Sequence, residues 1–206
     1  MSDTAISEQN QAGQPGLRQR KKRLLQEAIE EAALKLFVQR GYEETSIQDI
    51  AEAVMISPRT FFRYFPSKEA VLLGPTRAVM QAGLEHLRAL PPGQSGIEGA
   101  RDALRIALLR IADLYQQQRR GFLLRYRIAQ QVPSVAAFYL YALLDAEIAF
   151  NDLLQERMRG TCESSKLRLL VATQVATLRV ALEQWLDEGA QSDLQTLLAT
   201  YLGEGD

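Results

Sequence analysis

Apolar residues recur with the period of an α-helix along most of the chain. From Leu24 to Phe37 they fall at helical spacing, and Gly41 ends this run. A clear loop signal follows at Pro91-Pro92-Gly93. Beyond that loop the spacing predicts helices near 97–118, 119–131, 134–159, 164–188 and 191–202. No alternation typical of strands stands out, so the expected fold class is all-α.

Between Gly41 and Pro66, capping residues and prolines predict two short helices. Thr45, followed three positions later by a glutamine, forms a capping-box pattern that predicts a helix over about 46–54. Ser57 suits the N-cap of the next helix and Pro58 its first position, while Pro66 ends it. Two short helices joined by a tight turn are typical of a helix-turn-helix.

The second of these helices has two unlike faces. At roughly 100° per residue, Phe61 and Phe65 share one face, whereas Arg59 and Arg63 share the opposite one. Such a helix suits the major groove, because the phenylalanines anchor it and the arginines reach base edges and phosphates. The same pattern also describes an ordinary amphipathic surface helix.

Cationic residues gather at two places near this motif. Five of them lie between Arg18 and Arg23 with no acid among them, and they can follow the phosphate backbone or enter the minor groove as an arm. A solvated charge run is the alternative. Lys68 stands at a predicted helix start, where the helix dipole disfavours a cation and where a DNA phosphate would explain its presence.

Composition narrows the classes of function. The 206 residues carry a net charge of −1 and are 47 % hydrophobic, so the chain can bury a sizeable core and is not a polycation. One cysteine, Cys162, and one histidine, His86, offer neither a disulfide nor a ligand-spaced metal cluster. No apolar stretch reaches the roughly 18 residues of a membrane span, and no signal region is visible. We therefore expect a cytoplasmic protein with no metal, no cofactor and no membrane contact.

One segment resembles a known family in both residues and spacing. It reads Leu36-Phe37 … Gly41-Tyr42 … Thr45-Ser46-Ile47 … Asp49-Ile50-Ala51 … Ile56-Ser57 … Thr60-Phe61-Phe62-Arg63-Tyr64-Phe65 … Ser67-Lys68-Glu69. Over about residues 18–73 it is similar to the N-terminal DNA-binding domain of the TetR family. The resemblance implies a homodimeric, ligand-responsive regulator, more often a repressor than an activator, that binds double-stranded DNA at a palindromic operator.

The motif and the resemblance together give the candidate DNA-binding residues. They are Arg18, Arg20, Lys22, Thr45, Ser46, Ser57, Pro58, Arg59, Thr60, Arg63, Tyr64 and Lys68. Two departures from the family affect the details. The family usually has glycine where this chain has Met55, so either a positive φ or another form of turn is expected. It often has tyrosine where Phe62 stands, and phenylalanine cannot donate a hydrogen bond to a phosphate.

The expected organisation is a flexible tail over 1–16, a helix-turn-helix domain over 17–73, and a helical ligand-binding and dimerisation domain over 74–206. The helix near 134–159 is apolar nearly all round in its first half, so we expect it to be central and buried. A pocket for a small apolar or amphipathic effector is expected among the surrounding helices. Its candidate lining residues are Tyr115, Arg125, Tyr126, Phe138, Tyr141, Asp145 and Trp185. The alternative is that the aromatic residues form plain core and that Asp145 pairs with an arginine.

The last two predicted helices carry long apolar rows, which suit a homodimer interface over about 164–202. Two other classes of function stay open from the residues alone. A helical adaptor would bind another protein through these C-terminal helices. A small helical-bundle enzyme would need a catalytic constellation, and none is recognisable.

Overall fold

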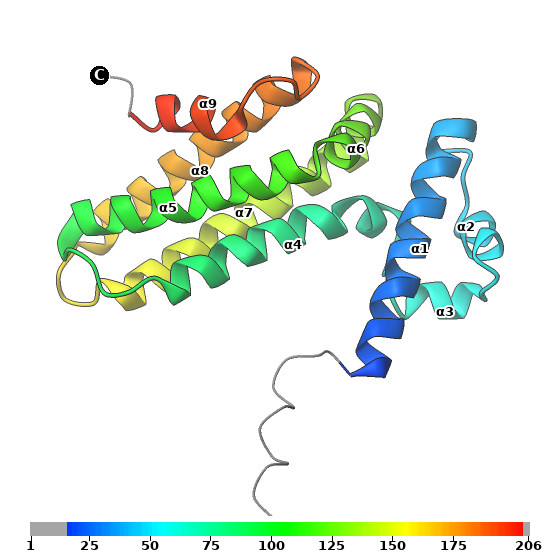
Figure 1. The fold of residues 1–206 in the computed structure, drawn as a ribbon, viewed down its shortest axis with the longest axis horizontal. Coiled ribbons are helices and arrows are strands. Elements are labelled where there is room, and N and C mark those ends of the chain that lie inside the picture. The colour runs from blue at the N-terminus through cyan, green and yellow to red at the C-terminus, as the bar shows by residue number, and fades with distance from the viewer. Residues whose placement is uncertain (1–15, 204–206) are drawn as a thin grey trace, which may run out of the picture. The chain divides into compact units, whose positions relative to one another are not determined.

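The computed structural model describes residues 16–203, which form nine helices and no strand (Figure 1). The helices are α1 (Leu17–Arg40), α2 (Ile47–Ala53), α3 (Pro58–Phe62), α4 (Lys68–Ala89), α5 (Gly96–Gln117), α6 (Arg119–Gln131), α7 (Pro133–Arg157), α8 (Ser164–Asp187) and α9 (Leu194–Tyr201). The all-α prediction is confirmed. The predicted tail over 1–16 lies outside the described residues, apart from Gly16.

The chain divides into two compact units, Met1–Val71 and Leu72–Asp206. The division falls inside α4, so this helix contributes to both units. The boundary expected from the sequence, after residue 73, lies two residues further along.

In the first unit, α2 packs against both α1 and α3. The core consists of side chains at apolar positions of the helical pattern: Ile29, Ala33, Phe37, Ile50, Ala51, Phe61 and Phe65. The rings of Phe61 and Phe65 lie 5.9 Å apart between their centroids. Because three helices of this size bury little surface, each large core side chain carries a large share of the stability of the unit.

In the second unit, α8 packs against α5, α7 and α9, and α6 packs against α7. The inner face of α8 is almost fully buried, with Val171, Leu178 and Trp185 inaccessible to solvent. Helix α4 approaches α5 so closely that a Cβ at Gly83 would come within 2.5 Å of the Ile111 side chain. Glycine is therefore the residue that permits this approach.

Most predicted helix ends agree with the structure, and the exceptions have local causes. The break between α5 and α6 falls at Gln118, where the predicted ranges 97–118 and 119–131 meet. Helix α9 begins at Leu194 rather than near 191, because the Asp193 carboxylate caps it by accepting the Thr196 N–H at 2.7 Å. Pro75 stands inside α4, where the pattern predicted an ordinary helix.

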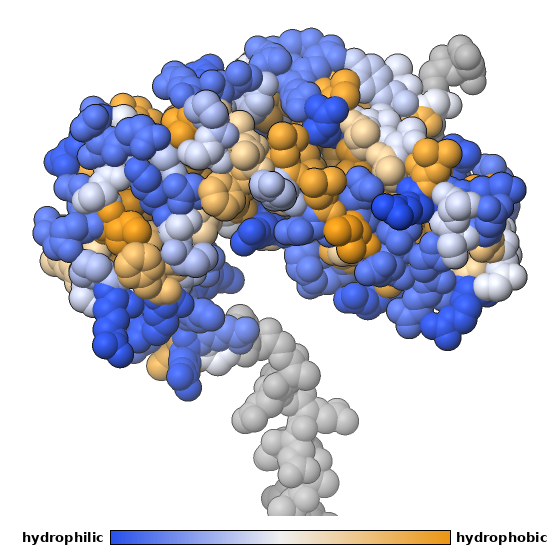
Figure 2. Space-filling model, turned by 180° about the vertical axis from the view of Figure 1, so that it is seen from behind, coloured by the Kyte–Doolittle hydropathy of each residue, from blue (hydrophilic) through white to orange (hydrophobic). Residues whose placement is uncertain are grey.

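The prediction that the helix near 134–159 is buried all round is wrong. Only one face of α7 is buried, whereas Tyr141 and Ile148 on another face are 67 % and 61 % exposed. By length and composition α7 alone among the described helices could cross a membrane, with 22 % of its apolar window buried within the chain. Hydrophobic side chains are visible at the protein surface in Figure 2. When a helix is apolar on all sides, its sequence does not tell which side packs against the rest of the protein.

Candidate nucleic-acid interface and internal cavity

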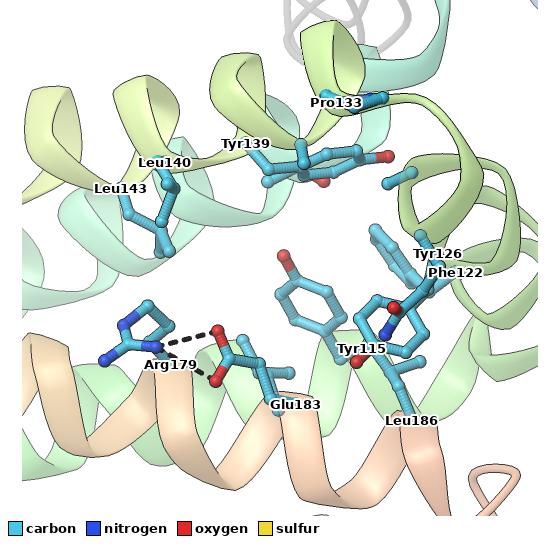
Figure 3. Close-up of a pocket in the computed structure, with 15 residues that line it drawn as sticks. Tyr115, Phe122, Tyr126, Pro133, Tyr139, Leu140, Leu143, Arg179, Glu183 and Leu186 are labelled. Atoms are coloured by element: carbon cyan, nitrogen blue, oxygen red, sulfur yellow. Dashed lines mark hydrogen bonds and ion pairs between the residues drawn. The ribbon is translucent and has the colours of Figure 1, made fainter.

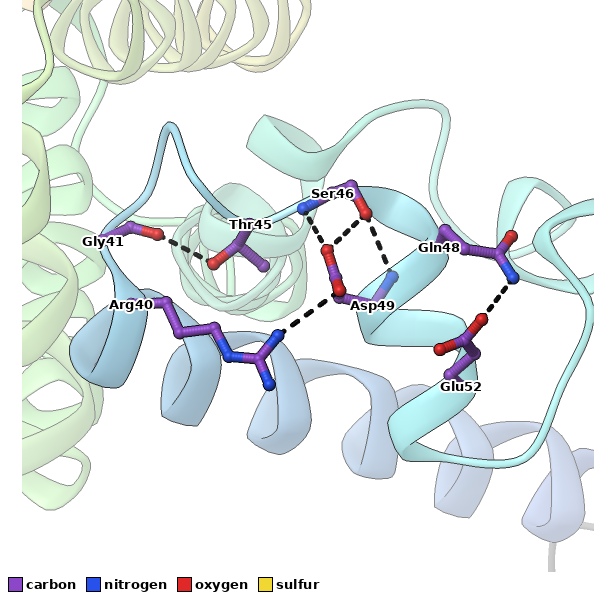
Figure 4. A network of polar contacts seen from close by, with 7 residues as sticks. All are labelled: Arg40, Gly41, Thr45, Ser46, Gln48, Asp49 and Glu52. Atoms are coloured by element: carbon purple, nitrogen blue, oxygen red, sulfur yellow. Dashed lines mark hydrogen bonds and ion pairs between the residues drawn. The ribbon is translucent and has the colours of Figure 1, made fainter.

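A compact polar network fixes the start of α2 (Figure 4). The Ser46 hydroxyl accepts the Asp49 N–H at 3.1 Å, and the Asp49 carboxylate accepts the Ser46 N–H at 2.9 Å. This is a capping box, but it begins one residue later than predicted, with Asp49 in the role expected of Gln48. The hydrogen bonds from Ser46, helped by the charge of Arg40, hold the pKa of the Asp49 carboxyl below its usual range.

Thr45, a predicted DNA-binding residue, does not face solvent. Its side chain is fully buried, and its hydroxyl donates to the Gly41 carbonyl at 2.7 Å. That bond satisfies a carbonyl just beyond the end of α1. Thr45 therefore stabilises the loop before α2, whereas the neighbouring Ser46 is exposed.

The turn between α2 and α3 is a Schellman motif. The Ile56 N–H donates to the Ala51 carbonyl at 2.9 Å, and the Met55 N–H donates to the Glu52 carbonyl at 3.0 Å. Met55 occupies the position that glycine usually takes in this motif, and its φ is +55°. Of the two outcomes expected at this residue, positive φ is the one observed. The Met55 side chain is 94 % exposed, so no packing offsets the backbone strain.

The start of α3 agrees with the prediction and its end does not. The Ser57 hydroxyl caps the helix by accepting the Thr60 N–H at 3.1 Å, and Pro58 is the first helical residue. The helix ends at Phe62, well before Pro66. Beyond Phe62 the chain tightens, because the Tyr64 N–H bonds the carbonyl three residues before it at 2.8 Å.

The side chains of α3 and the turn after it separate into the two predicted faces. Phe61 and Phe65 are 0 % and 3 % exposed. Arg59 and Arg63 are exposed on the other side, where Thr60 and Tyr64 are half-buried. This segment therefore has an anchored aromatic face and a free cationic face, which is the arrangement that a major-groove helix needs.

Lys68 is bound inside the first unit. Its ammonium group donates to the carbonyl oxygens of Tyr42 at 2.9 Å and Thr45 at 3.4 Å, and it lies 4.2 Å from the centroid of the Tyr42 ring. The Tyr42 hydroxyl in turn donates to the Glu69 carboxylate at 2.5 Å, and burial together with this bond raises the Tyr42 pKa. These partners explain a cation at a helix start without any phosphate. They give Lys68 a structural role, and its predicted contact with a phosphate stays a prediction.

The cationic run near the N-terminus is helical. Helix α1 begins at Leu17 and includes Arg18, Arg20 and Lys22, all of them exposed. Their helical form favours contact along the phosphate backbone over an arm in the minor groove. The first turn of α1 contains no acidic residue, and Gly16 provides no side-chain cap, so this end of the helix favours an anion.

A cavity of about 530 Å³ lies within the second unit (Figure 3). Helices α4 to α8 all contribute to its mostly apolar and aromatic wall: Thr76, Tyr115, Phe122, Tyr126, Ala129, Gln130, Pro133, Ala136, Tyr139, Leu140, Leu143, Arg179, Leu182, Glu183 and Leu186. A volume and lining of this kind are typical of a site for a small organic molecule. Of the seven predicted lining residues, the structure brings Tyr115 and Tyr126 to this cavity.

Two of the other five predicted residues belong to the protein interior outside the cavity. Trp185 is fully buried, and its indole N–H donates to the Ser192 carbonyl at 2.9 Å. Arg125 is also buried, and its guanidinium donates to the Gly121 carbonyl at 3.2 Å. Both are structural residues, which is the alternative that the sequence left open for Trp185.

The remaining three, Phe138, Tyr141 and Asp145, lie on the exposed side of α7. The residues that α7 turns toward the cavity are Ala136, Tyr139, Leu140 and Leu143. These recur at helical spacing, so the sequence contained the signal. It could not be used, because α7 has two apolar stripes and periodicity does not tell which of them faces inward.

The cavity contains few polar groups. Burial raises the pKa of Tyr115 to about 12, so its hydroxyl stays protonated at neutral pH. The Arg179 guanidinium contacts the two carboxylate oxygens of Glu183 at 2.8 and 2.9 Å. Residues 16–203 contain no group of three or more His, Cys, Asp and Glu side chains that could hold a metal ion. The arrangement can bind a molecule, and no nucleophile paired with a base faces it.

The amino-acid sequence matches the models of two known families. One, described as bacterial regulatory proteins of the tetR family, matches residues 29–74, and the other, described as the MftR C-terminal domain, matches residues 98–204. The HTH-type transcriptional regulator TcmR of Streptomyces glaucescens is 34 % identical over 190 residues. That alignment covers 91 % of this chain and 84 % of TcmR.

Solved structures show the same architecture. FadR of Thermus thermophilus, a TetR-family transcriptional repressor in complex with lauroyl-CoA, has a TM-score of 0.59 at 26 % identity, covering 86 % of this chain and 91 % of FadR. The fatty acid degradation regulator FadR of Bacillus halodurans has a TM-score of 0.57 at 18 % identity, covering 92 % and 95 %, a likeness that concerns the fold alone. These relatives are transcriptional regulators and not enzymes. Together with the helix-turn-helix in the first unit, they show that this chain belongs to the TetR family of DNA-binding transcriptional regulators.

Proposed function

We propose that this protein is a homodimeric repressor that leaves its operator when a small apolar or amphipathic molecule enters the cavity. The observation that carries the DNA-binding part is the exposed cationic face of α3, opposite buried Phe61 and Phe65. Arg59 lies in the first turn of α3, where a side chain in the major groove reaches base edges. Arg63 lies one turn later and is assigned to a phosphate.

Further DNA contacts are assigned to residues at the starts of α2 and α3 and just after α3. The hydroxyls of Ser46, Ser57, Thr60 and Tyr64 can donate to phosphates, whereas Pro58, which has no N–H, can make only apolar contacts. Arg18, Arg20 and Lys22 at the start of α1 supply additional positive charge. Thr45 and Lys68 act indirectly, since their polar atoms hold the loop before α2 and the start of α4.

The dimer interface is assigned to the outer face of α8 with α9. Leu169, Val180 and Tyr201 are 69 %, 44 % and 41 % exposed there. Two copies joined through this face would present two recognition helices to half-sites roughly 34–36 Å apart. Val180→Glu should convert a dimer to a monomer in light scattering. A monomer for the unaltered protein at micromolar concentration, with and without DNA, contradicts the assignment.

The ligand-binding part rests on the cavity. FadR of Thermus thermophilus, which shares the fold, is in complex with lauroyl-CoA, an amphipathic molecule with an apolar acyl chain, and this supports a ligand with an apolar part here. Helix α4 provides a route for coupling, because it contributes Thr76 to the cavity wall and begins at Lys68 in the DNA-binding unit. We expect ligand binding to weaken operator binding by about 1–3 kcal/mol, the usual range for allosteric coupling.

The test uses Arg59→Ala and a duplex from the promoter upstream of the protein's own gene. An arginine that binds guanine contributes about 1–3 kcal/mol of discrimination. Arg59→Ala should therefore reduce affinity for the operator more than affinity for a scrambled duplex of the same length. Arg88→Ala, an exposed arginine of the second unit, is the matched control and should change neither. Equal losses on both duplexes would show that Arg59 does not read bases.

A further inference from the structure

Hydroxyl groups from three helices meet at one part of the cavity wall. Thr76 comes from α4, Tyr115 from α5 and Tyr139 from α7. The Thr76 hydroxyl is buried and has no partner of ordinary hydrogen-bond geometry among the described residues, although the hydroxyls of Tyr115 and Tyr139 are its polar neighbours. The Tyr115 hydroxyl points into the cavity (Figure 3). The three hydroxyls form the polar part of an otherwise mostly apolar wall, and a polar ligand atom would bind there.

These hydroxyls are hydrogen-bond donors at neutral pH. Burial raises the pKa of Tyr115 to about 12, and burial also raises the pKa of Tyr139. A protonated tyrosine hydroxyl can donate one hydrogen bond, and the natural complement is an oxygen that accepts. The cluster therefore suits a carbonyl or similar acceptor on the ligand.

The charged side chains that line the cavity favour an uncharged ligand. Arg179 and Glu183 are the charged residues in the wall, and they neutralise each other at 2.8 and 2.9 Å. An anionic ligand would have to separate this pair or lie against apolar side chains, and both cost free energy. The rings of Tyr115 and Phe122, 4.1 Å apart between centroids, offer aromatic surface to a flat apolar body.

Tyr139 links this cluster to α4. Its hydroxyl donates to the Leu72 carbonyl at 3.2 Å, at the first residue of the second unit. Pro75 lies within the same turn of α4 and has no N–H, so the helix is already short of one hydrogen bond there. Since Tyr139 has one proton to donate, a ligand oxygen and the Leu72 carbonyl compete for it.

We propose that the cavity selects an uncharged, flat, apolar molecule with an accepting oxygen, and that this oxygen takes the Tyr139 hydrogen bond away from Leu72 next to Pro75. This deepens the proposed function and rests on it, because the cavity is assumed to hold the effector. Tyr139 is then the residue through which the ligand acts on α4.

The experiment compares three probes with the same ring system: naphthalene, 2-acetylnaphthalene and 2-naphthoate. Binding to the full-length protein is measured by calorimetry, and release of operator DNA is measured separately. The neutral ketone should bind most tightly. In Tyr139→Phe the ketone should lose affinity, by at most about tenfold, because in the unaltered protein its new hydrogen bond is partly offset by the loss of the bond to Leu72, while naphthalene is unchanged. Without any probe, Tyr139→Phe should bind operator DNA more weakly than the unaltered protein does, because it lacks the hydrogen bond to Leu72 that the ketone would remove.

Tyr126→Phe is the matched control. Its ring lines the same cavity, but its hydroxyl already donates to Asp187 at 2.8 Å, so ketone affinity should not change. Thr76→Val provides a second variant and should weaken the ketone without weakening naphthalene.

Each contrary result has a distinct meaning. If 2-naphthoate binds more tightly than the ketone, the proposal that the ligand is uncharged is wrong. If the ketone and naphthalene bind with equal affinity, the proposal of an accepting oxygen is wrong. Binding of none of the three probes overturns the inference as a whole. If the predicted order of affinities appears but no probe releases DNA, the assigned ligand class stands and the proposed ligand-released repressor fails.

Discussion

The two units of this protein build their sites in opposite ways. The DNA-binding unit presents a surface whose geometry is fixed by bonds between near neighbours, such as Ser46 with Asp49 and Ser57 with Thr60. The second unit contains a cavity whose lining residues bind partners far away in the chain, such as Tyr126 with Asp187 and Tyr139 with Leu72. Local bonds leave a signature in the sequence, and distant ones do not. The comparison thus separates what a sequence can specify locally from what only packing decides.

The largest expected effect tests whether the two units hold their structure separately. Phe61→Ala removes a fully buried ring from the small first core and should cost about 3–5 kcal/mol, enough to unfold that unit. Trp185 is the single tryptophan and lies in the core of the second unit. When urea unfolding is followed by Trp185 fluorescence, the midpoint of the transition should therefore be the same in Phe61→Ala as in the unaltered protein. The circular dichroism signal should be weaker, because the helices of the first unit are lost.

Phe62→Ala is the control for this substitution. Its ring is 53 % exposed, so the change in stability should stay within about 0.5 kcal/mol. If Phe61→Ala also lowers the fluorescence midpoint, the two units unfold together and the comparison between them loses its basis.

A smaller effect tests the role of Lys68. Lys68→Met keeps the apolar stem and removes the charged donor to Tyr42 and Thr45, which should cost about 1.5–3 kcal/mol of stability. Lys35→Met, an exposed position on α1, should cost less than about 0.5 kcal/mol. Where the protein stays folded, the salt dependence of DNA binding should be unchanged in Lys68→Met. A fall of the salt slope by about one would instead restore a phosphate contact.

The smallest effect concerns the strained turn. Met55→Gly relieves a positive φ that costs a side-chain-bearing residue roughly 1–2 kcal/mol, and it adds roughly 0.5–1 kcal/mol of chain entropy to the unfolded state. A net gain of about 0.5 kcal/mol in the free energy of unfolding should follow. Ala53→Gly, two residues earlier in α2, should lower stability by up to about 1 kcal/mol. A loss in both variants would show that the Schellman turn holds Met55 without strain.

The same contrast explains how much the sequence could predict. Helix order, the Ser57 cap and the faces of α3 followed from spacing and end signals, because each depends on residues within one or two turns. The capping box was misplaced by one residue, since Thr45 and Ser46 are both acceptable caps and only packing buries the first. The carbonyl partners of Lys68 could not be predicted, because they lie 23 and 26 positions away in the chain. In the cavity, Thr76, Tyr139, Arg179 and Glu183 were missed for the same reason.

The division inside α4 has a consequence for the construction of hybrid regulators. The contacts that anchor the start of this helix, from Lys68 to Tyr42 and from Tyr42 to Glu69, come from residues before Leu72. The Tyr139 contact on the cavity side is made to Leu72 itself. A crossover between Val71 and Leu72 therefore keeps both sets of contacts within their own parental halves. Sensor modules and operator-recognition modules of related regulators can be recombined at that peptide bond.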